Sequence, residues 1–190
     1  LTMIGAGRLA PHLIRAHAAV RPIAEVTIWN RSRTRAEEVA AMLAGETFSV
    51  MVTQDRQAAI HSADIVSAAT ISSEPLIEGR WLKPGAHVDL VGAFTPKLRE
   101  SDDETVRRAS LFVDTFDGAL KEGGDLVQPI EAGVISRDAV RADLAMLTRG
   151  RHPGRTSDDE ITLFKSTGAA LEDFAAGSMV YEKWRGKAGL

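Results

Sequence analysis

Short apolar runs with β-branched residues alternate with helical patterns along most of the chain, and this alternation limits the possible fold more than any other feature. Strands separated by helices of about a dozen residues form βαβ units, which build a parallel sheet with helices on both faces. The runs with strand character are 1–4, 26–29, 48–52, 65–69, 87–91, 111–114 and 161–165, and those with helical spacing are 8–19, 34–43, 56–61, 102–109, 136–146 and 169–184. We therefore predict an α/β fold with a doubly wound, mostly parallel sheet of the Rossmann type.

The composition argues against several classes of function. The formal net charge of -3 gives no basis for expecting nucleic acid or an anionic membrane surface as a partner. Cysteine is absent and the five histidines lie far apart, so we predict no disulfide, no thiolate chemistry and no metal site. No apolar run reaches the roughly 18–20 residues that a membrane span needs, and no signal-peptide pattern is recognisable. We expect a cytoplasmic protein.

Very few residues precede the glycine-rich turn that follows the first predicted strand. Residues 1–4 run straight into Gly5, whereas strands usually have about 5–6 residues. We therefore expect an N-terminal part of the natural protein to precede this sequence. Residues 1–150 are predicted to form a dinucleotide-binding Rossmann domain. Residues 151–190 are predicted to form a loop, a strand and a C-terminal helix that close this domain or pack on the preceding part.

The strongest local motif is a glycine-rich turn between the first strand and the first helix, with the sequence Gly5-Ala6-Gly7-Arg8-Leu9-Ala10. In a G-x-G-x-x-A motif, the first glycine permits the tight turn, the second admits a pyrophosphate close to the backbone, and the small third residue lets the helix approach its strand. The helix N-terminus offers N–H groups and a positive dipole end to the phosphates. The alternative is a tight turn with no ligand.

The end of the second strand distinguishes between cofactors. An NAD-binding domain usually has Asp or Glu about 20 residues after the glycines, where it accepts hydrogen bonds from the ribose 2′-hydroxyl. This chain has Asn30-Arg31-Ser32-Arg33 there and no carboxylate. Guanidinium groups pair with phosphate in a bidentate way, so the motif favours the 2′-phosphate of NADP(H). The alternative is that the two arginines are solvated residues at a helix start, where cations oppose the helix dipole.

Several segments, in order and spanning nearly the whole chain, resemble the ornithine cyclodeaminase and mu-crystallin family. They are 4–7, 91–96, 99–103, 112–114, 119–125, 163–168 and 170–173. The resemblance implies a homodimer whose subunits each have a Rossmann domain and a separate, largely N-terminal domain for dimerisation and substrate binding. It also implies that basic residues of that second domain hold the substrate carboxylate, so the principal catalytic residues would lie outside this sequence.

Two positions narrow the activity that the resemblance implies. Cyclodeaminases carry an aspartate for proton transfer where this chain has Phe94, and a phenyl ring is neither an acid nor a base. The pair Asn30-Arg31 is similar to the NADPH-using mu-crystallin branch. We therefore predict an NADP(H)-dependent oxidoreductase that reduces an imine of a 2-oxo acid, such as pyrroline- or piperideine-2-carboxylate, or acts as an amino-acid dehydrogenase. The alternatives are a cyclodeaminase-type lyase with bound NAD, and a mu-crystallin-like binding protein with little turnover.

The remaining candidates follow the ends of the central strands, where an open parallel sheet binds its ligands. Phe94 is predicted to line the substrate pocket, with filling of the core as the alternative. Lys165 either holds the carboxamide or a substrate oxygen, or is a surface lysine whose stem packs on the protein. Asp102 and Asp103 are expected at a helix N-terminus, Asp125 in a turn, and no histidine in catalysis. The residues predicted near the nicotinamide are Ala69, Thr70, Val91, Gly92, Ala93, Lys165, Ser166 and Gly168.

Overall fold

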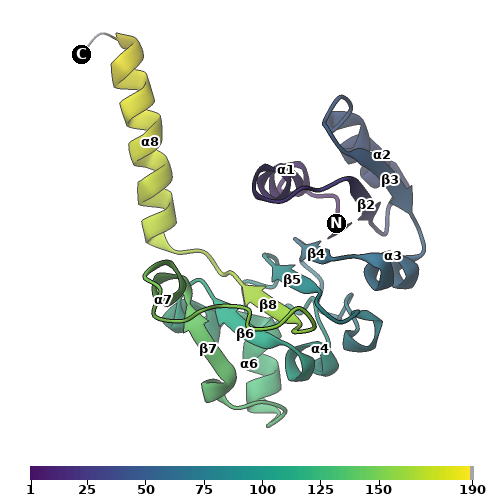
Figure 1. Cartoon of the computed structure of the whole chain (residues 1–190), viewed down its shortest axis with the longest axis vertical. Coiled ribbons are helices and arrows are strands. Elements are labelled where there is room, and N and C mark those ends of the chain that lie inside the picture. Colours follow the sequence, from purple (N-terminus) through teal and green to yellow (C-terminus); the bar gives the residue numbers. More distant parts are fainter. Residues whose placement is uncertain (189–190) are drawn as a thin grey trace.

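A computed structural model describes residues 1–188 of the chain, and its centre is a sheet of eight parallel strands (Figure 1). The strands are β1 (Thr2–Ile4), β2 (Glu25–Trp29), β3 (Ser49–Thr53), β4 (Ile65–Ala68), β5 (His87–Leu90), β6 (Ser110–Val113), β7 (Val140–Asp143) and β8 (Thr162–Lys165). Their order in the sheet is β3-β2-β1-β4-β5-β8-β6-β7. The strand order reverses between β1 and β4, which is where a doubly wound sheet opens a crevice for a ligand. The predicted fold class is confirmed.

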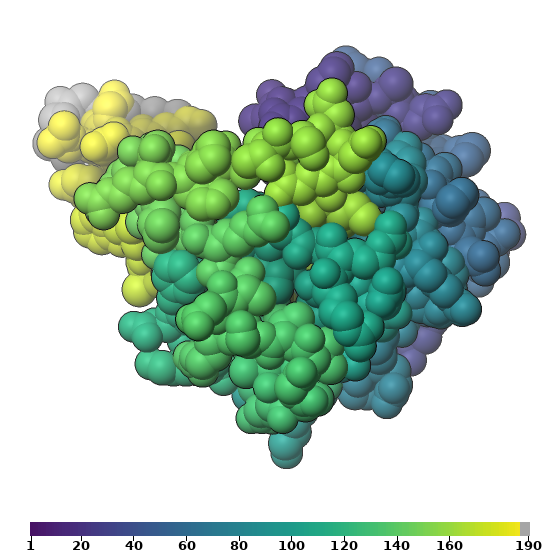
Figure 2. Space-filling model, turned by 60° about the horizontal axis from the view of Figure 1, so that its bottom comes forward, coloured from purple at the N-terminus to yellow at the C-terminus, as the bar shows by residue number. Residues whose placement is uncertain are grey.

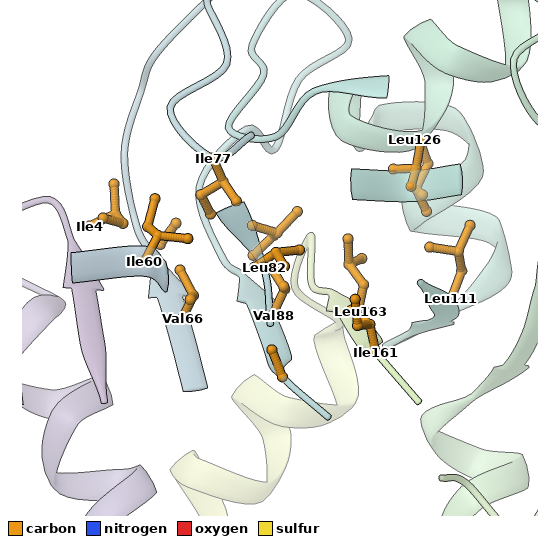
Figure 3. Packing of buried hydrophobic residues seen from close by; sticks show 14 of the residues in the cluster. Ile4, Ile60, Val66, Ile77, Leu82, Val88, Leu111, Leu126, Ile161 and Leu163 are labelled. Carbon is orange, nitrogen blue, oxygen red and sulfur yellow. The ribbon is translucent and has the colours of Figure 1, made fainter. Parts of the chain in front are cut away.

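Two hydrophobic clusters lie on the two faces of the sheet. The helices are α1 (Ala10–Val20), α2 (Arg33–Met42), α3 (Arg56–Ser62), α4 (Asp103–Arg108), α5 (Phe116–Glu122), α6 (Gly124–Glu131), α7 (Leu144–Thr148) and α8 (Ala170–Ala188). Helices α1 and α2 cover one face through residues such as Ile14 and Val39. Helices α3, α4, α5 and α6 cover the other face, where Ile60 and Leu126 belong to the same cluster as the strand residue Leu163 (Figure 3). Burying each such side chain contributes about 1.5–3 kcal/mol, so both layers hold the strand ends in place.

The predicted helix over 136–146 is wrong. A short 3-10 turn (Arg137–Ala139) leads into the edge strand β7, and only then does α7 begin. Within β7, Val140 and Ala142 are buried while Arg141 is exposed, so the period is two residues rather than 3.6. The helices α5 and α6 were not predicted, because the glycines between them and Pro129 inside α6 are residues that usually interrupt helices.

The last strand does not sit at an edge of the sheet. β8 pairs with β5 on one side and with β6 on the other, so it completes the middle of the sheet. After it, α8 projects away from the body of the protein (Figures 1 and 2). Its exposed apolar side chains are Leu171, Phe174, Met179, Val180, Tyr181 and Trp184.

Candidate dinucleotide-binding site

Gly5 is required by the protein's own packing. Its φ of 103° lies in the region that favours glycine. A Cβ at this position would lie 2.9 Å from Cγ2 of Thr70 and 3.0 Å from the carbonyl oxygen of Ala69. The turn after β1 is thus pressed against the end of β4, and only glycine permits that approach.

Gly7 has no such requirement. It is exposed, and a Cβ built on it would meet only the Ala69 carbonyl oxygen, at 4.0 Å. The backbone N–H groups of Gly7, Arg8 and Leu9 donate to no acceptor in residues 1–188. α1 follows without a side-chain cap and without an acidic residue in its first turn. Free donors and an uncompensated dipole end fit a pyrophosphate, and the open space over Gly7 is where its oxygens would approach.

Asn30 connects the end of β2 to the glycine turn. Its Oδ1 accepts a hydrogen bond from the Ala6 N–H at 3.3 Å, and its Nδ2 donates to the Ser32 carbonyl oxygen at 2.9 Å. The side chain that sequence reasoning placed against the cofactor is therefore occupied with backbone groups. Its contribution is to fix the turn relative to the arginines that follow.

The two arginines after Asn30 differ in their surroundings. Ser32 caps α2, since its Oγ accepts from the Arg35 N–H at 3.5 Å. Arg33 lies within that helix and pairs with Glu37, with its Nε 2.8 Å from Oε1. Arg31 is exposed and forms no ion pair within the described part of the chain. Arg31 is thus the guanidinium most available to a 2′-phosphate, while Arg33 would have to share its charge with Glu37.

The ends of β4 and β5 lie against each other beside the switch point. A Cβ on Gly92 would lie 2.1 Å from the Thr70 carbonyl oxygen. Ala93 follows with φ of 39°, a left-handed conformation that is uncommon for a residue with a Cβ. Phe94 is 50% exposed, so its ring faces outward and the alternative that it fills the core is wrong.

A cluster of three charged side chains, Glu100, Asp125 and Lys165, is buried beneath these strand ends, and each has an exposed fraction of 0%. Lys165 Nζ lies 3.4 Å from Asp125 Oδ2 and donates to the Gly92 carbonyl oxygen at 2.5 Å. Asp125 Oδ1 accepts from the N–H groups of Glu100 and Ser101, each at 2.8 Å. We call these three residues the buried charge cluster.

The buried charge cluster changes three sequence-based interpretations. Lys165 is not a surface lysine, because its side chain is fully buried. Its ammonium donates to the Gly92 carbonyl oxygen and is not exposed to a bound ligand. Asp125 lies in the first turn of α6 and not in an isolated turn. Glu100 was missed altogether, because nothing in the polar run 99–104 distinguishes a buried carboxyl from its exposed neighbours. Asp102, the N-cap of α4, was predicted correctly.

Burial, with a smaller contribution from Asp125, raises the pKa of Glu100 to about 7, whereas Lys165 acts in the opposite direction. Its Oε1 accepts from Thr70 twice, from the N–H at 2.6 Å and from the hydroxyl at 2.9 Å. Its Oε2 is buried and has no hydrogen-bond partner among the described residues. A carboxyl that titrates near neutrality thus lies directly behind the end of β4.

Asp114 organises the loop after β8. Its Oδ2 accepts from the Ser166 hydroxyl at 3.1 Å and from the N–H groups of Thr167 and Gly168, each at 2.7 Å. Ser166 and Gly168, both predicted near the nicotinamide, are therefore held by a carboxylate that sequence reasoning had not selected. The carboxylate at the end of β6 fixes the loop at the end of its neighbour β8.

The polar side chains around Asp89 do not form a catalytic triad. Ser67 and His17 both bind Asp89 Oδ2, at 2.8 and 3.1 Å, so the serine and the histidine do not bind each other as they would in a triad. Within residues 1–188, no three His, Cys, Asp or Glu side chains lie close enough together to hold a metal ion. No helix in the same range has the length and apolar character needed to cross a membrane.

Comparison with known proteins identifies relatives over the whole chain. The Delta(1)-pyrroline-2-carboxylate reductase of Paracoccus denitrificans is 41% identical over 181 residues, which are 95% of this chain and 57% of that protein. The ketimine reductase mu-crystallin of Mus musculus is 37% identical over 184 residues, which are 97% of this chain and 55% of that protein.

The structure of Thermococcus litoralis Delta(1)-pyrroline-2-carboxylate reductase, in complex with NADH and L-proline, superposes with a TM-score of 0.95 at 34% identity. The superposition includes 100% of this chain and 58% of that protein. This chain thus spans somewhat more than half the length of each of these relatives. Residues 1–188 match the profile of the ornithine cyclodeaminase/mu-crystallin family. The chain belongs to that family.

Proposed function

We propose that this chain is the dinucleotide-binding part of an NADP(H)-dependent reductase that acts on imines of 2-oxo acids, such as pyrroline- or piperideine-2-carboxylate. The relatives named as pyrroline-2-carboxylate and ketimine reductases support the reaction class. The observation that carries the cofactor choice is the exposed Arg31 beside the end of β2, in a segment without a carboxylate. An acid at that place would repel a 2′-phosphate, and a guanidinium attracts one.

Each strand end has a separate role in this function. The free N–H groups of Gly7, Arg8 and Leu9 would bind the pyrophosphate, and Arg31 with Ser32 would bind the 2′-phosphate. The bound cofactor supplies the hydride. Gly92 and Ala93 would bring backbone against the nicotinamide half and exclude water from it.

Phe94 supports reduction over cyclodeamination. It is 50% exposed after the end of β5 and holds no proton to transfer. Hydride transfer to an iminium neutralises a positive charge, so the site needs to orient the substrate more than to supply an acid or a base. We further propose, from the family resemblance, that the whole protein is a homodimer, for which light scattering would give the mass.

Binding constants of NADPH and NADH for the full-length protein test the proposal, measured by tryptophan fluorescence at fixed salt. We expect NADPH to bind at least about tenfold tighter, a difference of about 1.4 kcal/mol. Arg31→Ala removes most of that preference and leaves NADH binding unchanged. Arg137→Ala, which alters an exposed arginine of the 3-10 turn before β7, is the matched control and changes neither constant.

Activity separates reduction from the lyase alternative. The reductase consumes NADPH when a cyclic imine acid is added, whereas a cyclodeaminase releases ammonia from ornithine without net consumption of cofactor. A preference for NADH, or ammonia release from ornithine, would overturn the proposal.

A further inference from the structure

We propose that Glu100 is a positioning residue for the nicotinamide half of the dinucleotide: it holds Thr70 in place, packs against Gly92 and, as a buried anion, favours the oxidised ring over the reduced ring. The inference rests on the proposed function, since it needs a nicotinamide over the ends of β4 and β5. It goes beyond that function by assigning to one side chain a preference for the redox state of the cofactor.

The position of Glu100 follows from the topology. With the adenosine end of the cofactor at Arg31 after β2, the molecule crosses the switch point between β1 and β4, and its nicotinamide end lies over β4 and β5. Thr70 and Gly92 lie two residues after the ends of β4 and β5. Glu100 Oε1 lies 2.6 Å from the Thr70 N–H nitrogen, and a Cβ on Gly92 would lie 2.4 Å from the same oxygen. The Glu100 carboxyl thus lies directly against the backbone that follows β4 and β5.

The ionisation of Glu100 determines the net charge of the buried charge cluster. Asp125 from α6 and Lys165 from β8 are the charged groups that act on it, and they form a close pair. The buried charge cluster is therefore neutral when Glu100 is protonated and carries one negative charge when it is ionised. Its pKa of about 7 places the change within the physiological range.

The nicotinamide ring carries a positive charge when oxidised and none when reduced. In a poorly solvated site, the Glu100 carboxylate attracts the oxidised ring and the protonated carboxyl does not. By linkage, the oxidised cofactor must in turn favour the carboxylate, so its binding releases a proton from Glu100 to solvent. The reduced cofactor leaves that proton in place.

The experiment measures dissociation constants of NADPH and NADP⁺ for the full-length protein at about pH 6 and about pH 8, on either side of the Glu100 pKa of about 7. The ratio Kd(NADPH)/Kd(NADP⁺) is expected to rise about fivefold between the two pH values, which is the part of a one-unit pKa coupling that falls within this pH range. Both nucleotides carry the same 2′-phosphate, so its own titration cancels in the ratio.

Glu100→Gln keeps an oxygen that accepts from Thr70 and cannot ionise, so its ratio should be independent of pH. Glu131→Gln, which changes an exposed glutamate at the end of α6, should behave as the wild type. If Glu100→Gln does not fold, calorimetry of the wild type in buffers of different ionisation enthalpy supplies the second measurement. NADP⁺ should then release more protons on binding than NADPH.

A ratio that is flat in the wild type, or equally steep in Glu100→Gln, would overturn the assignment, as would equal proton release by the two nucleotides. These outcomes differ from failure of the proposed function. A protein that prefers NADH refutes the NADP(H) proposal, and the same measurement is then made with NADH and NAD⁺.

Discussion

Replacing the Lys165 ammonium by an apolar group of similar shape perturbs the buried charge cluster most directly. In Lys165→Met, the Asp125 carboxylate loses a cation 3.4 Å away, and the Gly92 carbonyl oxygen loses a donor at 2.5 Å. Two unit charges 3.4 Å apart attract by about 5 kcal/mol at an effective dielectric constant of about 20. Breaking one side of a buried ion pair costs about 3–5 kcal/mol. We expect a loss of that size in the free energy of unfolding.

A double-mutant cycle separates the ion pair from the loss of packing. Asp125→Asn keeps an oxygen for the backbone N–H groups of Glu100 and Ser101 and removes the charge. The double variant with Lys165→Met then has no unpaired carboxylate at position 125, so it should be more stable than the sum of the single losses by at least about 2 kcal/mol.

Urea unfolding near pH 8, followed by tryptophan fluorescence and extrapolated linearly, gives the free energies of unfolding of the full-length wild type and its three variants. If Lys165→Met costs less than about 1 kcal/mol, or if the single losses add within about 0.5 kcal/mol, the ion pair is not what stabilises this part of the fold.

Two further predictions concern the glycine turn and the pH dependence of stability. Gly7→Ala should leave the melting temperature unchanged and weaken cofactor binding. Gly5→Ala should lower the melting temperature even without cofactor, because its Cβ would lie 2.9 Å from Cγ2 of Thr70. Equal effects of the two substitutions on the melting temperature would contradict this distinction. Burial raises the Glu100 pKa from 4.5 to about 7, so this group's contribution to stability is full below pH 4.5 and is lost as the pH rises through 7. Burial lowers the His87 pKa from 6.5 to about 4, so its contribution is full above pH 6.5 and is lost as the pH falls through 4. The two contributions, each about 3 kcal/mol, offset each other in the wild type. Between about pH 4 and pH 7, the free energy of unfolding should rise with pH in Glu100→Gln and fall with pH in His87→Gln. Parallel curves of this free energy against pH for the two variants would refute the assignment.

The parts of the fold that could be predicted from the sequence are those with local signals. β1 and the glycine turn were predicted from adjacent residues, because the tight turn and the helix start depend on chemistry within a few positions. The strand 162–165 was also predicted, since its apolar side chains are consecutive. Its place between β5 and β6 was not, because pairing partners depend on contacts between residues distant in the sequence.

In the candidate site, too, residues in local motifs could be predicted and residues brought together by distant contacts could not. Gly5 and Arg31 were selected because each belongs to a compact motif. The buried charge cluster was not recognised, because its members lie at positions 100, 125 and 165 and meet only through the sheet. The local sequence does not distinguish a buried glutamate, aspartate or lysine from an exposed one. Phe94 was selected because the strand preceding it ends at a predictable position, and its place in a substrate pocket stays a prediction.

The central position of β8 constrains how the protein is made. During synthesis, β5 and β6 leave the ribosome at least 49 residues before Thr162, the first residue of the strand that must lie between them. Until then, the sheet β3-β2-β1-β4-β5 and the hydrogen-bonded pair β6-β7 each have an exposed edge, and such edges recruit other strands. A nascent chain therefore passes through a stage with two unjoined halves, during which chaperone binding would be of most use. Protein stopped short of this strand would be prone to aggregate rather than remain a smaller Rossmann domain.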